Sequence, residues 1–327
     1  MKNMFCDSVV MVFTLLLFSF LLSNCNSNDP NEPTNPVVPH LERWGIYSLD
    51  LTSELTELIY SSSNQISFVR LSNSGDKFIF SQKINGELNE NKEICEIGTD
   101  GNGFRSITSN NYWDLYPCWS PDDERIAFLS FRETDLDIYV MNSTGSNETK
   151  LFDSGFHDAD IDWHGDKIYF TSQSKIWSIS EEGTVLSQIT EPPRAGEWGN
   201  ANLPFGDYDP RVNPDGTELV FERMVDDQSV HGNYNIYTIN LNSGVETELT
   251  ANGYSQGLVE WSHAGDKLVY IVAAIGTEGK YDIYMMNSNG SDNHSIMPSY
   301  FPAEFLCHLA MFSIDDTKIY FLGEWWE

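Results

Sequence analysis

The segment SPDDERIAF at residues 120–128 decides the fold, because related segments occur six times along the chain. Each copy combines a polar turn containing Gly or Asp with a run of β-branched and aromatic residues, which is typical of a β-strand after a tight turn. The other copies are SNSGDKFIF (72–80), HGDKIYF (164–170), NPDGTELVF (213–221), SHAGDKLVY (262–270) and SIDDTKIYF (313–321). The turn residues in register are Gly75, Asp123, Gly165, Gly216, Gly265 and Asp316, and they lie 42 to 51 residues apart. This period is typical of a propeller blade.

A second pattern, Ile followed by an aromatic residue, marks another strand of each repeat. It occurs at Ile46-Tyr47, Ile138-Tyr139, Ile176-Trp177, Ile236-Tyr237 and Ile283-Tyr284, with Ile94-Cys95 as the outlier. Each repeat therefore predicts four antiparallel strands, and the whole predicts an all-β, six-bladed β-propeller. The chain starts with the last two strands of a blade and ends with the first two. We expect the N-terminal strands to complete the C-terminal blade, because such closure removes free sheet edges.

The motif P-x-W-S-P-D at 117–122, followed by IAF and DIYVMN, resembles the repeat of TolB-type propellers. The resemblance covers residues 43–327, although the third copy lacks two turn residues and the first lacks the Trp. It implies the fold, whereas function must be argued from a site, since propellers have many activities.

The N-terminal segment predicts export and lipid attachment. Lys2 precedes an apolar run at 9–22, and Leu22-Ser23-Asn24-Cys25 resembles the lipobox of bacterial lipoproteins. We therefore expect a signal peptide at 1–24, with lipidated Cys25 starting an Asn- and Pro-rich tether at 25–42. An ordinary signal peptide with an incidental Cys is the alternative. The predicted location is the bacterial outer membrane, facing the periplasm or the surface, because the lipobox is followed by Asn and not by the Asp that resembles an inner-membrane retention signal.

Charge and cysteine content narrow the function classes. The chain has 18 Lys and Arg against 49 Asp and Glu, a formal net charge of −31. This excess argues against nucleic-acid binding and against docking on anionic membranes, which both need clustered basic residues. Membrane association is therefore expected through the lipid anchor only. Cys95, Cys118 and Cys307 have no CxxC or metal-site spacing, so we expect buried free thiols.

Loop lengths predict which face binds. The loops between blades, and those between second and third strands, are long and irregular, whereas the other turns are short and uniform. Binding residues are usually found on the variable face. The candidates for ligand contact there are Trp113, Asp114, Asp158, Trp198, Asp207, Tyr208, Tyr254 and His308. Trp198 is the strongest of them, because it lies within the longest insertion.

Two sets of charged residues are expected near the channel. We align the six repeats on Trp119 and its equivalents, which we call the Trp119 column. Five residues before this column, three consecutive repeats have an aspartate: Asp114, Asp158 and Asp207. These three form a weak candidate site for Ca²⁺. The alternative is that each Asp caps backbone N–H groups of its own loop. One residue before that column, the chain carries Arg70, Asp162, Arg211 and Glu260. These predict a charge network in which Arg211 is shared between two carboxylates.

Together these features predict a non-catalytic binding propeller whose partner is an envelope protein or a glycan. No cofactor is expected apart from the candidate Ca²⁺, and the oligomeric state stays open. One alternative is an envelope enzyme acting on polysaccharide or peptide at the channel mouth, with Asp114, Asp158, Asp207 and His308 as its residues. Another is a purely structural subunit of an envelope complex. Residues 253–257 match the G-x-S-x-G motif of hydrolases, but we interpret the match as a coincidence. The nucleophile elbow of these enzymes needs a helix after it, and here a predicted strand follows.

Overall fold

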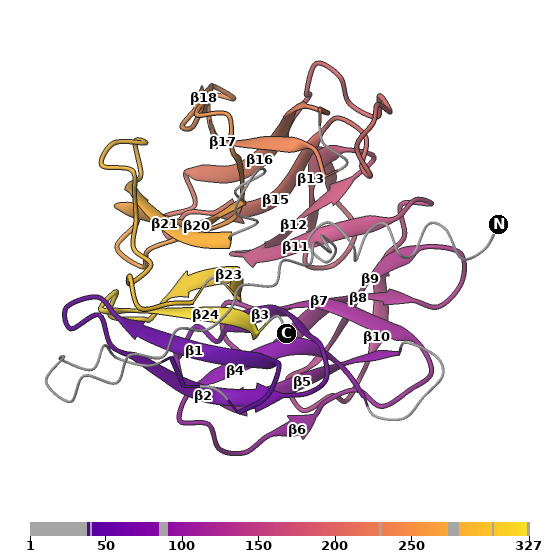
Figure 1. Cartoon of the computed structure of the whole chain (residues 1–327). Helices are drawn as coiled ribbons and strands as arrows, with labels where there is room; N and C mark the ends of the chain where they lie inside the picture. The colour runs from indigo at the N-terminus through magenta and orange to yellow at the C-terminus, as the bar shows by residue number, and fades with distance from the viewer. Residues whose placement is uncertain are drawn as a thin grey trace, which may run out of the picture.

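The computed structural model describes residues 38–39, 41–84, 91–228, 231–273, 281–302 and 304–325. Within these ranges the chain forms six four-stranded antiparallel sheets and no helix. The sheets follow one another around a central axis, as blades of a propeller (Figure 1). The predicted all-β, six-bladed propeller is confirmed.

The strands fall into four concentric classes. The innermost strands are β3 (Ile66–Leu71), β7 (Trp113–Trp119), β11 (Asp158–His164), β15 (Asp207–Val212), β19 (Ser255–Trp261) and β23 (Phe305–Phe312). The second strands are β4 (Lys77–Lys83), β8 (Arg125–Phe131), β12 (Lys167–Ser172), β16 (Glu218–Asp226), β20 (Lys267–Ala273) and β24 (Lys318–Trp325). The third strands are β5 (Lys92–Gly98), β9 (Leu136–Asn142), β13 (Lys175–Ser180), β17 (Asn233–Asn240), β21 (Tyr281–Asn287) and β1 (Trp44–Asp50). The outer strands are β6 (Arg105–Ser106), β10 (Thr149–Phe152), β14 (Leu186–Gln188), β18 (Glu246–Glu248), β22 (His294–Ser295) and β2 (Thr56–Ser62).

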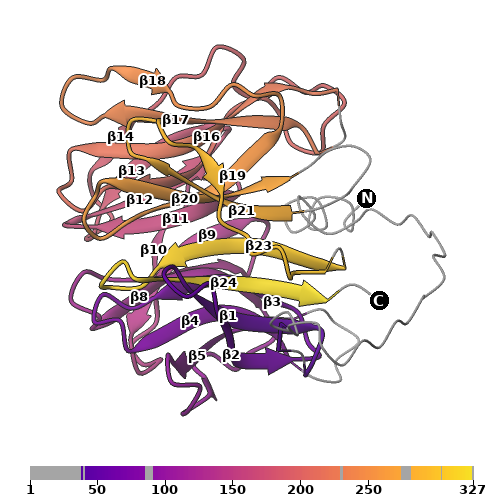
Figure 2. The same ribbon diagram turned by 60° about the vertical axis from the view of Figure 1, so that its left-hand side comes forward.

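The ring closes by pairing the two ends of the propeller. The sixth sheet has the order β2-β1-β24-β23, and Trp44 pairs with Glu324 at one end of the β1–β24 ladder while Asp50 pairs with Lys318 at the other. Indigo β1 and yellow β24 lie side by side in Figure 2. The N-terminal strands thus complete the C-terminal blade, as the sequence predicted.

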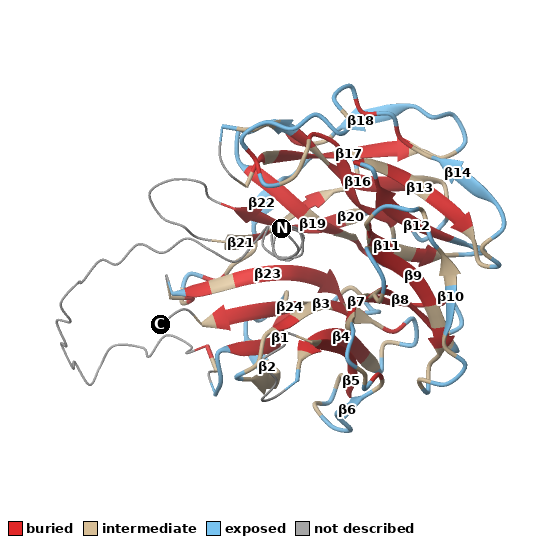
Figure 3. Cartoon of the chain, turned by 90° about the vertical axis from the view of Figure 1, so that its right-hand side faces the viewer, coloured by how far each residue is buried: buried red, intermediate tan, exposed pale blue. Residues whose placement is uncertain are grey.

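One aromatic residue per blade anchors the core between neighbouring sheets. It is the last residue of each repeated segment quoted above, at Phe80, Phe128, Phe170, Phe221, Tyr270 and Phe321, and each is at most 1% exposed. Fully burying one such side chain contributes about 1.5–3 kcal/mol. Burial is concentrated in the inner strands, whereas outer strands such as β14 and β18 are exposed (Figure 3).

Two of the repeated turns use Asp where the others use Gly. Asp123 and Asp316 have φ of 58° and 56°, in the left-handed region. The Asp123 carboxylate also accepts the backbone N–H groups of Asn73 (2.8 Å) and Ser74 (2.8 Å) in the preceding blade. Asp316 does the same for the turn at His263. These aspartates therefore join neighbouring blades as well as making their own turns.

Each inner strand contains a β-bulge near its middle. In five of them a non-glycine residue takes a φ between 51° and 56°, and these residues are Phe68, Tyr116, Asp160, Asp209 and Leu258. In β23 the register shift falls between Cys307 and Leu309 instead. Bulges re-aim side chains and often lie beside functional sites. Here they set which residues face the central cavity.

Cys95, Cys118 and Cys307 are buried and free, as expected. A search of the described part of the chain for long apolar helices that could cross a membrane finds none. Residues 1–37, which include the expected signal peptide, Cys25 and most of the tether, lie outside the described residues.

Candidate functional site

A cavity of about 690 Å³ lies at one end of the channel, on the face that carries the long loops. Its lining comes from the inner-strand bulges, from the loop around Phe156 and His157, and from the insertion at 191–206. This volume is within the range of small-ligand sites, which are typically about 300–1,000 Å³. The cavity is therefore the main candidate for a functional site in the described structure.

Aromatic side chains form much of the cavity wall. Phe68 and Tyr116, from adjacent blades, stack with ring centroids 3.5 Å apart. Trp198 stands at the rim and is 60% exposed. The insertion that carries Trp198 is held by Phe205, which is buried against Tyr208 and its neighbours. The exposed indole is thus presented from a well-anchored loop.

Three carboxyl groups lie in the depth of the cavity: Asp160 on β11, Asp209 on β15 and Glu222 on β16. The Glu222 carboxylate accepts the backbone N–H of Leu258 in the next blade. A Cβ at Gly257 would lie 2.5 Å from both Glu222 carboxylate oxygens, so the absence of a side chain there makes room for Glu222. The second glycine of the G-x-S-x-G segment therefore has a packing role.

Burial raises the pKa of all three carboxyl groups, and the charge of Asp160 adds to the shifts of the other two. Burial, with the nearby charge of Asp160, raises the pKa of Glu222 to about 8. Burial and the charges of Asp160 and Glu222 raise the pKa of Asp209 well above its usual range. Burial also raises the pKa of Asp160. Asp209 and Glu222 are hydrogen-bonded to each other, so they act as a pair that shares a proton.

Two tyrosines accompany the carboxyl groups. Burial and the charges of Asp160 and Asp209 raise the pKa of Tyr116 well above its usual value. Tyr234 lines the cavity with its residue only 4% exposed, and its buried hydroxyl has no hydrogen-bond partner within the described structure. A buried hydroxyl without a partner is costly, so it suggests a group that a ligand could satisfy.

A charge network lies next to the cavity on the inner strands. Arg211 donates from Nε to Glu260 (2.7 Å) and from Nη2 to Asp209 (2.8 Å), and Arg70 pairs with the same Glu260 (2.5 Å). Arg211 is therefore shared between two carboxylates, but the second is Asp209 and not the expected Asp162. Asp162 instead accepts the backbone N–H of Val212 at 3.0 Å. Burial and the charge of Glu260 raise its pKa to about 7.

Of the eight residues expected to contact ligand, three line the cavity: Trp198, Tyr208 and His308. His308 Nε2 lies 2.7 Å from Glu324 Oε2. The Tyr208 hydroxyl donates to the Pro204 carbonyl oxygen at 2.6 Å. Trp113 packs against Phe131, and Tyr254 is exposed elsewhere.

The three aspartates of the candidate Ca²⁺ site are fully buried and do not line the cavity. Asp114 accepts from Ser130 (2.6 Å), Asp158 accepts from Ser154 (2.6 Å), and Asp207 forms a two-point ion pair with Arg223 (2.6 and 2.8 Å). Each is thus bound within or beside its own blade. Calcium binding by this set stays a prediction that calorimetric titration with Ca²⁺ would test.

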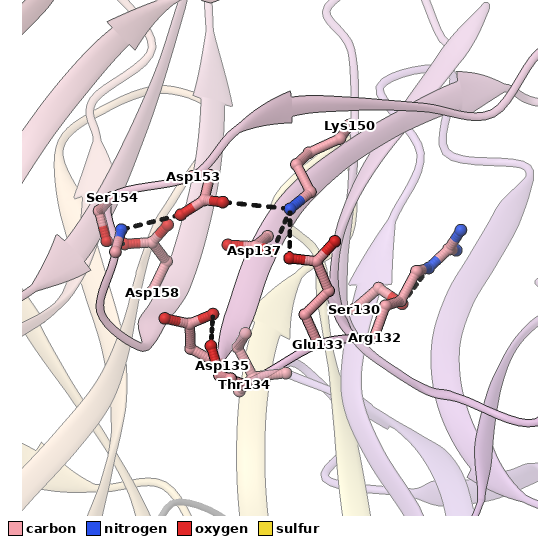
Figure 4. A network of polar contacts seen from close by, with 12 residues as sticks. Ser130, Arg132, Glu133, Thr134, Asp135, Asp137, Lys150, Asp153, Ser154 and Asp158 are labelled. Carbon is pink, nitrogen blue, oxygen red and sulfur yellow. Dashed lines mark hydrogen bonds and ion pairs between the residues drawn. The ribbon is translucent and has the colours of Figure 1, made fainter.

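A different acidic cluster lies at the edge of the second blade. Asp135, Asp137 and Asp153 have carboxylate oxygens within 4.8 Å of one another. The Lys150 ammonium forms ion pairs with two of these carboxylates, 2.8 Å from Asp137 Oδ2 and 3.1 Å from Asp153 Oδ2 (Figure 4). The cluster therefore already has a cation from the chain itself.

Comparison with known proteins supports the fold. No family model matches the chain. It is 27% identical over 113 residues to the Tol-Pal system protein TolB of Desulfosudis oleivorans, covering 33% of this chain and 25% of that protein. The structure of a protein described as a TolB candidate, from Agrobacterium tumefaciens, superposes with a TM-score of 0.65 at 14% identity, covering 87% of this chain and 99% of the other. The fold of this chain is that of a TolB-type β-propeller.

Other relatives agree with this TolB-type fold. The chain is 29% identical over 193 residues to an uncharacterised protein of Agrobacterium fabrum, covering 54% of this chain and 61% of that protein. TolB of Acinetobacter baumannii superposes with a TM-score of 0.54 at 18% identity, over 81% of this chain and 65% of the other. The matches span less than two thirds of the length of these curated relatives.

The carboxyl groups of this TolB-type propeller were not identified as site residues from the sequence. The sequence did contain a signal for two of them, because Asp160 and Asp209 occupy the same position in neighbouring repeats, three residues before the Trp119 column. The six residues at this position are Phe68, Tyr116, Asp160, Asp209, Leu258 and Leu309. That column contains the bulge residues of five blades. Glu222 lies in a second strand and had no comparable signal.

Proposed function

We propose that this protein is a non-catalytic binding propeller of the bacterial envelope, and that its ligand enters the cavity on the long-loop face. The observation that carries the proposal is the cavity itself, which combines aromatic walls with buried carboxyl groups. Pockets that are mostly apolar, with a few convergent polar groups, are typical binding sites. The TolB names among its relatives favour an envelope protein as partner, with a glycan as the other candidate.

Site-specific photo-crosslinking in living bacterial cells tests this proposal. A photoreactive amino acid at Trp198 would be compared with the same group at Val245, which is 62% exposed and lies in a short turn of the opposite face. We expect a discrete adduct from position 198 that is absent from position 245. Adducts of equal yield at both positions, or none at 198, would contradict binding through this face.

We further propose attachment to the outer membrane through lipid on Cys25, supported by the lipobox-like sequence at 22–25. A Cys25→Ser variant should move from the membrane fraction to the soluble fraction, with Cys6→Ser as the matched control that stays in the membrane. If Cys25→Ser is still recovered with membranes in detergent-phase partition, lipid attachment at this residue is wrong.

The alternative of an envelope enzyme acting on polysaccharide or peptide is kept because of one observation. Asp209 and Glu222 are hydrogen-bonded carboxyl groups with raised pKa values in a cavity, an arrangement used for acid–base chemistry. The enzyme would then use these residues and not the buried Asp114, Asp158 and Asp207. Release of reducing sugar or of peptide fragments by the wild type, lost in Glu222→Gln, would favour the enzyme over the binding protein.

A further inference from the structure

We infer that the cavity recognises a positively charged organic group, an ammonium or a guanidinium, carried on an apolar or aromatic body. This inference rests on the proposed function, since it names the chemistry of the ligand that the cavity takes.

The first argument is the charge imbalance of the cavity. Asp160, Asp209 and Glu222 line it, and the lysine that also lines it, Lys175, is already bound to Glu191 at 2.7 and 2.8 Å. The structure records no ion pair for Asp160 or Glu222 within the described ranges. A ligand cation would stabilise the ionised form of these carboxyl groups, which their burial disfavours.

The deeper channel does not correct this imbalance. Arg70 and Arg211 both bind Glu260, and only Arg211 reaches one of the cavity carboxylates, Asp209. Both arginines are thus engaged on the inner strands. Asp160 and Glu222 are left as acceptors for a cation that enters from the cavity.

The second argument is the aromatic surroundings and the unpartnered hydroxyl. Tyr234 lies in the cavity lining with a buried hydroxyl that has no partner, next to the ring of Tyr208 at a centroid distance of 6.0 Å. The hydroxyl could accept a hydrogen bond from an N–H donor. The rings of Tyr116 and Trp177, also in the lining, suit cation–π contact and the apolar body of the ligand.

The third argument concerns the kind of cation. Among the described residues, the three acidic side chains whose oxygens all lie within 4.8 Å of one another are Asp135, Asp137 and Asp153, so the three cavity carboxyl groups do not form a three-ligand group of that kind. In the cluster of Asp135, Asp137 and Asp153, the Lys150 ammonium binds Asp137 and Asp153 (Figure 4). Carboxyl groups that do not form a three-ligand group suit an organic cation with several N–H donors.

Three small probes of one shape test the inference: 2-phenylethylammonium, 2-phenylethanol and 3-phenylpropionate. Binding to the full-length protein is measured by calorimetry and by the fluorescence of the tryptophans, including Trp198 at the rim. We expect the ammonium to bind about tenfold more tightly than the alcohol, as one charge-assisted hydrogen bond would give. The carboxylate should not bind.

Variants locate the effect. Glu222→Gln and Asp160→Asn should each weaken ammonium binding about tenfold, or about 1.4 kcal/mol, and leave alcohol binding unchanged. Glu57→Gln, at the exposed position of β2 and away from the cavity, is the matched control. The Asn variant keeps the test decisive if the Gln variant fails to fold.

The outcomes separate this inference from the proposed function. Equal binding of all three probes, or preference for the carboxylate, overturns the cation inference and leaves binding in the cavity standing. No probe binding together with crosslinks at position 198 overturns the inference alone. No probe binding and no crosslink at that position overturns both.

Discussion

Replacing Glu222 with Gln should make the protein less sensitive to alkaline pH. The pKa of Glu222 is raised from 4.5 to about 8 by burial and by Asp160, against the hydrogen bond from Leu258. Because the folded-state pKa lies above that of the unfolded chain, the folded state holds a proton that the unfolded state loses between these two values. The stabilisation is full below pH 4.5 and is lost as the pH rises through 8.

The size of the effect follows from the same two values. At about 1.4 kcal/mol for each unit of pKa, the shift corresponds to a loss of up to about 5 kcal/mol across this window. Sharing a proton with Asp209 distributes the loss over the pair, so we expect the variant to recover only part of it. The titratable and charged groups that face or act on this site are Tyr116, Asp160, Asp209, Tyr234, Arg70 and Arg211.

The assay is unfolding in guanidinium chloride at pH 5, 7 and 9, for the wild type, Glu222→Gln and the exposed control Glu57→Gln. Gln is close in shape to a protonated Glu, and it keeps an oxygen for the Leu258 N–H and an amide for Asp209. We expect the variant to match the wild type at pH 5 and to exceed it by a few kcal/mol at pH 9. Parallel curves for the wild type and Glu222→Gln would refute the reasoning.

Three further predictions concern packing and ion pairs. Gly257→Ala should lower the free energy of unfolding by about 1–3 kcal/mol, because its Cβ meets the Glu222 carboxylate, and Glu222→Ala in the same chain should restore part of the loss in a double-mutant cycle. Asp123→Ala should destabilise more than Asp123→Gly in thermal unfolding, since Gly tolerates the φ of 58° and loses only the hydrogen bonds to the neighbouring blade. Arg211→Met should cost about 3–5 kcal/mol in chemical unfolding, because it removes the ion pair of the buried Asp209 and leaves Glu260 with Arg70 alone; a loss under about 1 kcal/mol would show that the network contributes little.

The repeat architecture could be read from local sequence. The alternation of strand residues and the turn chemistry at positions such as Gly75 and Asp123 are decided within a few residues, because φ, ψ and side-chain direction depend on near neighbours. Six copies of one unit, with half a blade at each end, then left a closed ring as the arrangement without free edges. The structure confirms that closure through the β1–β24 pairing.

The candidate site could be predicted from the sequence only in part. Loop length identified the face and Trp198, which lines the cavity, but column alignment selected Asp114, Asp158 and Asp207, which the structure places in contacts near their own blades. Alignment treats a strand as regular. It cannot show how a bulge turns the next side chains.

The sequence by itself therefore determined the blade, the number of blades and the way the ring closes, because these depend on local backbone preferences repeated six times. The tertiary structure alone decided that Asp160, Asp209 and Glu222 meet in one cavity. Glu222 reaches Leu258, 36 positions away, only across a blade boundary. The bulges and the rotation between blades set which carboxyl groups face one another in this cavity, where burial, together with the charge of Asp160, raises the pKa values of Asp209 and Glu222.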